Sequence, residues 1–171
     1  MSIKTNETER DRFVAYFTRI VNLDTKYVIH DAIRQRFRSS IARFMKNRYV
    51  YRSFWDFRRT GEPTDWEDWF EYDKQRVNEA LDVPGIRPPR SLGGATRENT
   101  SLVLSKLFDR LYVLRNQLMH GGATWKGRLN RKQVREGKEI LGFLIPLFVH
   151  LMMTKGWLDD WGEPPYPPIA D

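Results

Sequence analysis

The sequence predicts an all-α protein, and three observations carry that prediction. Leucines recur at alternating steps of three and four residues between Leu104 and Leu118, which is the spacing of one helix face. Capping residues followed three positions later by glutamate or glutamine mark helix starts at several points. No segment keeps the alternation of a strand for long. We therefore expect a four- to five-helix bundle with two long C-terminal helices joined by a short loop.

The first two helices are expected between Asn6 and Met45. Asn6 and Glu9 form a capping-box pattern that opens the first helix, and a break follows near residues 22–24. Asp24 can cap the second helix. Each helix has an apolar face that we expect to be buried: Phe13, Phe17, Ile20 and Val21 in the first, and Val28, Ile29, Ile33, Phe37, Ile41, Phe44 and Met45 in the second.

The middle of the chain holds a break, a third helix and a loop. Gly61 and Pro63 interrupt regular structure, and Thr64 with Glu67 opens a helix that is expected to end near Leu81. The stretch 84–94, PGIRPPRSLGG, contains too much proline and glycine for a regular element, so a loop is expected there.

The two long helices come last. The leucine-striped helix is expected over residues 102–120, because Gly121 and Gly122 are typical of a helix end. Asn130 and Gln133 form the capping pattern that opens the final helix.

The final helix is the most apolar part of the chain. It would run to about Lys155, with a kink at Pro146 because proline removes one helical hydrogen bond. Its apolar run, residues 140–153, is too short to span a bilayer, so we expect a buried helix and no membrane association. Residues 1–158 would then form one domain, and residues 159–171 a proline-rich, flexible tail.

Composition narrows the classes of function. The chain has 171 residues and a net charge of +7, which favours an anionic partner. It has no cysteine, and this argues against disulfides and thiolate metal sites and suits a cytoplasmic location. His30, His120 and His150 stand far apart, so neither a metal nor a cofactor is expected. Phosphate-binding loops, dinucleotide motifs and nucleophile elbows are missing, which leaves acid–base chemistry by histidine beside arginine.

Polar side chains gather near the end of the leucine-striped helix, on the face away from the leucines. Arg115, Asn116 and His120 are candidate catalytic residues, because RNA cleavage by its own 2′-hydroxyl needs only a proton shuttle and a nearby cation. Arg115 and His120 stand about 140° apart around the helix. A second copy about a two-fold axis would place two such sets in one cleft, with Tyr112 and Val113 at the contact.

The segment from Arg115 to His120, RNQLMH, resembles the R-x4-6-H motif of HEPN domains, in which a polar residue often follows the arginine. The resemblance covers residues 102–153, and it implies an all-α dimer whose motif helices face each other. It also implies metal-independent endoribonuclease activity that leaves a 2′,3′-cyclic phosphate. In such proteins Arg115 would stabilise the phosphate, His120 would transfer protons and Asn116 would assist.

Two basic stretches are candidate RNA contacts. One directly follows the motif, and the other, residues 34–59, interleaves nine basic side chains with aromatic ones that can stack on bases. A solvated helix face with its aromatics in the core explains the second stretch equally well. The candidate RNA-binding residues are Lys126, Arg128, Arg131, Arg135, Arg48 and Arg52.

The sequence thus predicts a homodimeric, metal-independent endoribonuclease that works through the 102–120 helix. HEPN ribonucleases of this kind act in toxin–antitoxin pairs or antiviral defence, often with a nucleotidyltransferase-type antitoxin as partner. A non-catalytic HEPN module that binds RNA or a partner protein is the alternative. A helical DNA-binding protein is a third possibility, which the missing helix-turn-helix signature disfavours.

Overall fold

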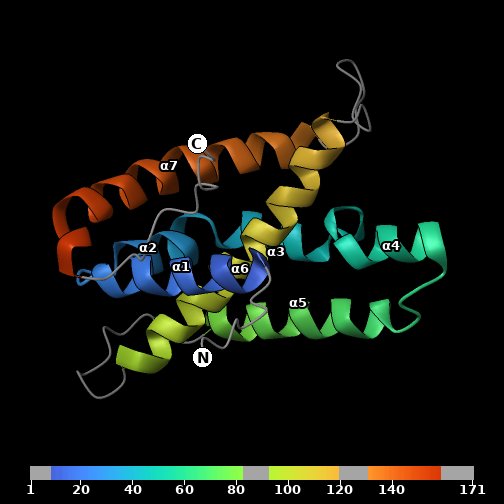
Figure 1. Ribbon diagram of the computed structural model, residues 1–171, viewed down its shortest axis with the longest axis horizontal. Coiled ribbons are helices and arrows are strands. Elements are labelled where there is room, and N and C mark those ends of the chain that lie inside the picture. Colours follow the sequence, from blue (N-terminus) through green and yellow to red (C-terminus); the bar gives the residue numbers. More distant parts are fainter. Residues whose placement is uncertain (1–8, 83–92, 120–130, 159–171) are drawn as a thin grey trace, which may run out of the picture.

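The computed structural model describes residues 9–82, 93–119 and 131–158, and the side chains of residues 15–82, 97–119 and 131–158. About 90% of the residues so described are helical and none of them lies in a strand, which confirms the all-α class. The expected four to five helices are too few, because seven α-helices lie within these ranges (Figure 1). They are α1 (Glu9–Leu23), α2 (Val28–Asp31), α3 (Arg38–Lys46), α4 (Arg52–Thr60), α5 (Trp66–Asp82), α6 (Gly93–Met119) and α7 (Arg131–Lys155).

Helix α6 is the centre of the fold. It packs against each of α1 to α5, and Figure 1 shows it crossing the molecule diagonally between α7 on one side and α5 on the other. The leucine stripe is confirmed as its buried face: Leu104, Leu107, Leu111 and Leu114 are all buried. The stripe ends there, because Leu118 is exposed.

Helix α6 also begins earlier than its leucine stripe suggests. Its first residues are Gly93 and Gly94, which the sequence assigned to a loop. The remainder of that expected loop lies outside the described residues. With 27 residues, α6 spans about 40 Å at the usual rise per residue, long enough to cross the whole bundle.

Asp24 binds the start of the second helix as predicted, although the N-cap position itself is Tyr27. Helix α1 ends at Leu23, and the buried Asp24 carboxylate accepts a hydrogen bond of 2.7 Å from the backbone N–H of Ile29 in α2. Tyr27, just before α2, has the left-handed φ of 58°. The side chain of Asn6, and that of Phe13, lie outside the described part of the chain.

The single second helix predicted from the sequence is divided by a π turn at Ala32–Arg36. Buried positions 29, 33, 37, 41 and 45 are each four residues apart. On an ideal helix such a stripe drifts by about 40° at every step, and a wider π turn takes up part of that drift. The prediction that Val28 points inward is wrong, since Val28 is exposed.

Helices α4 and α5 form a hairpin with a small core of its own. The predicted break is confirmed, because Gly61 ends α4 with a φ of 79° and its N–H bonds to the Phe57 carbonyl at 2.8 Å. Between α4 and α5 the Glu62–Pro63 peptide is cis. The core of the hairpin, here called the aromatic cluster, consists of Phe54, Trp66 and Phe70 with Tyr51 and Phe57 against them.

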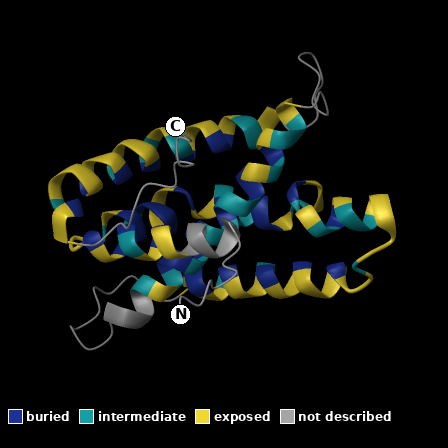
Figure 2. Cartoon of the chain, in the orientation of Figure 1, coloured by how far each residue is buried: buried dark blue, intermediate teal, exposed yellow. Residues whose placement is uncertain are grey.

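Helix α7 has the predicted bounds but not the predicted burial. It stays helical across Pro146, and one face packs inward through Ile140, Leu144 and Leu151. Its opposite face is exposed along most of its length (Figure 2). Only 22% of its most apolar window is buried, so the expectation of a buried helix is wrong. By length and composition alone, the helical stretch Arg131–Leu158, which is α7 with the 3-10 turn that follows it, is able to cross a membrane, a test that core helices of soluble proteins also pass.

One glycine brings α7 close to the rest of the bundle. A Cβ at Gly137 would stand 3.0 Å from the side chain of Leu111 and 3.6 Å from that of Phe44. These distances are at or below ordinary contact, so a side chain here requires its neighbours to shift. Gly137 therefore sets how closely α7 lies on α6 and α3.

Candidate functional site

The last turn of α6 carries Arg115 and Asn116 out of the core. Leu114 is the last buried leucine, and the next residue, Arg115, is exposed. The Arg115 Nη1 donates a hydrogen bond of 3.1 Å to Oδ1 of the half-buried Asn116. Two of the three predicted catalytic side chains are thus joined. The third, His120, lies outside the described residues.

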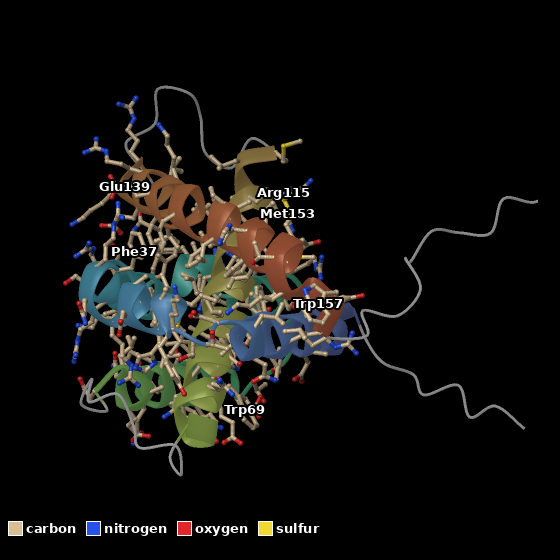
Figure 3. The ribbon with its side chains drawn as sticks, turned by 90° about the vertical axis from the view of Figure 1, so that its left-hand side faces the viewer. Phe37, Trp69, Arg115, Glu139, Met153 and Trp157 are labelled. Carbon is tan, nitrogen blue, oxygen red and sulfur yellow. The ribbon has the colours of Figure 1, made fainter. Side chains whose placement is uncertain are left out.

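Exposed apolar side chains surround Arg115 on the helix. Tyr112 is 56% exposed and Met119 is 68% exposed, while Val113 is half-buried. Figure 3 shows Arg115 on the same side of the molecule as Met153 of α7, opposite the side that carries Glu139. Large apolar groups beside an arginine are typical of a surface that contacts another molecule.

Gln117 connects this turn of α6 to the start of α4. Its side-chain amide donates a hydrogen bond to the backbone carbonyl of Tyr49, which lies in the 3-10 turn Arg48–Val50. The same carbonyl accepts a hydrogen bond of 2.7 Å from the indole N–H of Trp55. Sequence reasoning missed Gln117, because nothing in the sequence links residue 117 to residue 49.

Several arginines of the basic stretch 34–59 hold helices together. Arg34 is buried and donates to the Ala80 carbonyl at 2.5 Å. Burial lowers the pKa of its guanidinium, and the neighbouring positive charge of Arg38 lowers it further. Arg38 pairs with Asp82 of α5, and Arg43 donates to Glu136 of α7 at 2.7 Å. These side chains have structural partners, which favours the structural interpretation for this part of the stretch.

The two candidates nearer the end of that stretch differ from each other. Arg52 lies 3.8 Å from the Asp56 carboxylate, which also pairs with Arg59 at 2.9 Å. The Arg48 guanidinium lies over the rings of Tyr49 and Phe54, at 5.3 and 5.7 Å from their centroids. Arg48 is therefore placed among aromatic groups, whereas Arg52 is placed in an ion pair.

The candidates that follow the motif are only partly described. Arg131 and Arg135 are exposed on the first turns of α7. Lys126 and Arg128 fall outside the described residues. Of these four candidates, the structure therefore places Arg131 and Arg135 at the surface, on the first turns of α7.

The histidines within the described residues have different surroundings. His30 is buried, and its Nδ1 lies 2.9 Å from the Thr100 hydroxyl. Burial lowers the pKa of His30, and the positive charge of Arg34 acts in the same direction. His150 is exposed on α7. Among the described side chains, no three acidic or histidine residues come together as a metal-binding group.

No family model, curated protein or solved structure matches this chain. The HEPN resemblance therefore remains a prediction from the motif.

Proposed function

We propose that the protein is a metal-independent endoribonuclease of the HEPN type that acts as a homodimer. The observation that carries the proposal is the exposed Arg115, which directly follows the last buried leucine of α6 and is hydrogen-bonded to Asn116. In the sequence His120 follows four residues after Asn116. A cation with a polar partner and a proton-transferring group are the parts that this reaction requires.

In the proposed reaction the RNA supplies its own nucleophile. The 2′-oxygen bonds to the adjacent phosphorus while the bond from phosphorus to the 5′-oxygen breaks. His120 transfers protons, from the 2′-hydroxyl or to the leaving 5′-oxygen. Arg115 balances the charge that develops on the phosphate oxygens, with Asn116 holding the guanidinium. The products are a 2′,3′-cyclic phosphate and a free 5′-hydroxyl.

The proposed dimer forms through the outer face of α6. Tyr112 and Met119 are exposed there on either side of Arg115, and burying them against a second copy removes apolar surface from water. A two-fold axis at this face brings both copies of Arg115 to one cleft, so each active site would use residues of two chains. The proposed partners are therefore RNA and a second copy of the chain.

The setting follows from the same proposal. A cytoplasmic ribonuclease with no cofactor requires control, and a toxin–antitoxin pair or an antiviral response supplies it. An antitoxin, for example a nucleotidyltransferase-type protein, would cover the cleft at the end of α6. The net charge of +7 suits both RNA and an acidic inhibitor.

The test is RNA cleavage by the purified protein in EDTA. We expect cleavage to survive chelation, and Arg115→Ala and His120→Ala each to reduce its rate about a hundredfold or more. Arg76→Ala is the charge-matched control, because Arg76 is exposed on α5 and contacts the Tyr72 ring and hydroxyl. Product analysis should find a 2′,3′-cyclic phosphate.

Two results would contradict the proposal. Cleavage that is lost in EDTA and restored by a divalent cation would assign the chemistry to a metal. RNA binding without cleavage, with no inhibitor present, would make the protein a binding module. Arg115→Ala would then weaken binding without any rate to reduce.

A further inference from the structure

A pocket lies beside the last turn of α6, between the 3-10 turn at Arg48–Val50 and α4. Its volume is about 340 Å³, and two arginines and five aromatic side chains line it. Phe54 and Trp66 are buried and stand edge to face with ring centroids 5.2 Å apart. Tyr49 and Trp55 expose 48% and 44% of their surface. The pocket thus has a buried aromatic base and an accessible aromatic rim, at a size that suits a small planar group.

The rim of the pocket is fixed before any ligand arrives. The Trp55 indole N–H donates to the Tyr49 carbonyl at 2.7 Å, which sets the orientation of the indole. Both rim rings pack edge to face on Phe54, with centroids 5.2 Å away for Trp55 and 5.4 Å away for Tyr49. A ring already held in one orientation loses little entropy when a planar ligand stacks on it.

No described carboxylate neutralises the positive charge of the pocket, in which the Arg48 guanidinium lies over the Tyr49 and Phe54 rings. Along this part of the chain, Asp56 pairs with Arg52 and Arg59. Arg48 and Arg58 line the pocket, and among the described residues no carboxylate forms an ion pair with either of them. A ligand with both an aromatic part and a negative charge therefore fits the rim.

The pocket shares a hydrogen-bond acceptor with the candidate catalytic turn. The Tyr49 carbonyl receives the indole N–H of Trp55 from the pocket and the side-chain amide of Gln117 from α6. Gln117 follows Arg115 by two residues, a rise of about 3 Å along the helix. The pocket thus lies near the same end of α6 as Arg115, but Arg115 and Gln117 stand about 200° apart around the helix, so Arg115 points away from the pocket side of α6.

We propose that this pocket binds one unpaired nucleobase of a single-stranded RNA, with Arg48 and Arg58 contacting the adjoining phosphates. Every base offers a flat face to an aromatic ring, and guanidinium groups pair with phosphate. A duplex keeps its bases stacked inside the helix, so the pocket selects unpaired nucleotides. The choice of RNA as the ligand rests on the proposed function. The pocket adds that the protein recognises an unpaired nucleotide of that RNA.

The experiment measures binding separately from cleavage. A short fluorescein-labelled 2′-O-methyl RNA lacks the attacking hydroxyl, and its anisotropy is followed single-stranded and annealed to its complement. We expect Trp55→Ala to weaken single-strand binding about tenfold or more. Trp69→Ala is the matched control, because Trp69 is exposed on α5 outside the pocket and its indole donates to Asp65. The duplex should bind more weakly than the single strand.

The arginines give a second, independent measurement. Arg58→Ala should reduce the slope of log affinity against log salt concentration by about 0.7, the value for one phosphate contact on a single strand. Arg59→Ala, its neighbour paired with Asp56, should leave that slope unchanged. Both residues are exposed on α4, so this pair tests the pocket even if Trp55→Ala unfolds the aromatic cluster.

Three results would overturn the proposal. The first is an equal loss of binding in Trp55→Ala and Trp69→Ala, and the second is equal affinity for single strand and duplex. The third is unchanged RNA binding in Trp55→Ala. If that variant also loses binding of a peptide of residues 163–171, EPPYPPIAD, the pocket binds a proline-rich ligand instead. The two proposals fail in different ways. If the protein is not a ribonuclease, no cleavage is seen in EDTA, while the binding results with 2′-O-methyl RNA stay as expected.

Discussion

Helices α6 and α7 are nearly equal in length, with 27 and 25 residues, yet they occupy different places in the fold. Helix α6 packs against five other helices and even buries an arginine, Arg110, whose guanidinium lies 4.0 Å from the centroid of the Tyr51 ring. Helix α7 lies at the edge and exposes Met153 to 80%. The more apolar of the two helices is the less buried one. Burial thus depends on how many neighbours surround a helix, and composition alone does not determine it.

The difference in burial predicts that shortening an aliphatic side chain destabilises the protein far more in α6 than on the outer face of α7. Leu107 of α6 is completely buried, whereas Ile145 of α7 is 44% exposed. We expect Leu107→Ala to lower the free energy of unfolding by about 3–4 kcal/mol, because it removes buried methyl groups and leaves a cavity. Ile145→Ala should change it by less than about 1 kcal/mol. Urea denaturation followed by circular dichroism measures both values.

A large effect of Ile145→Ala would break the comparison. It would mean that the outer face of α7 is covered in the folded protein, for example by a second copy of the chain. Repeating the denaturation at several protein concentrations separates these cases, because a stabilising partner makes the midpoint depend on concentration.

Sequence reasoning succeeded where a pattern is local. The leucine stripe of α6, the break at Gly61 and the bond of Asp24 to the start of α2 each depend on a few neighbouring residues, and the structure has all three. The sequence also gives the bounds of α7 to within about a residue. Local chemistry is enough for such features, since capping and helix periodicity are completed within one or two turns.

It failed where a partner lies far along the chain. The stretch 34–59 looked basic because its neutralising acids come from Asp82 and Glu136, which pair with Arg38 and Arg43 at sequence separations of 44 and 93 residues. The hydrogen bond from Gln117 to the Tyr49 carbonyl, 68 residues away, is likewise invisible in the sequence. The π turn in the second helix and the exposed face of α7 also depend on how the whole bundle is packed.

Helices α6 and α7 each have an exposed apolar face, and a charge placed on one face or the other should affect the proposed dimer differently. If the dimer forms through α6, Tyr112→Glu places a carboxylate in the interface. It should raise the dimer dissociation constant about tenfold or more, because burying an unpaired charge costs well over 1.4 kcal/mol. Val149→Glu, at the exposed face of α7, should leave the constant unchanged. Sedimentation equilibrium of both variants measures the effect.

The opposite order of effects would reassign the interface. A dimer that survives Tyr112→Glu and dissociates in Val149→Glu is held by α7. The two copies of Arg115 would then not meet at the axis, and the composite active site would lose its geometry.

The smallest predicted effect concerns the opposite end of α6, where His30 of α2 contacts Thr100 of α6. Because burial and the nearby Arg34 lower the pKa of His30 below its ordinary value of 6.5, folding favours the neutral imidazole. The unfolded chain binds a proton more readily, so stability is fully present above about pH 6.5 and falls as the pH drops below it. The slope from this one proton is at most about 1.4 kcal/mol per pH unit.

His30→Gln should remove that part of the pH dependence while other titrating groups keep theirs. The measurement is the free energy of unfolding of both proteins between about pH 7.5 and 5.5, compared as a difference so that shared contributions cancel. Parallel curves for the two proteins would show that the imidazole takes up its proton equally well in both states. The contact between α2 and the first half of α6 would then be insensitive to acid.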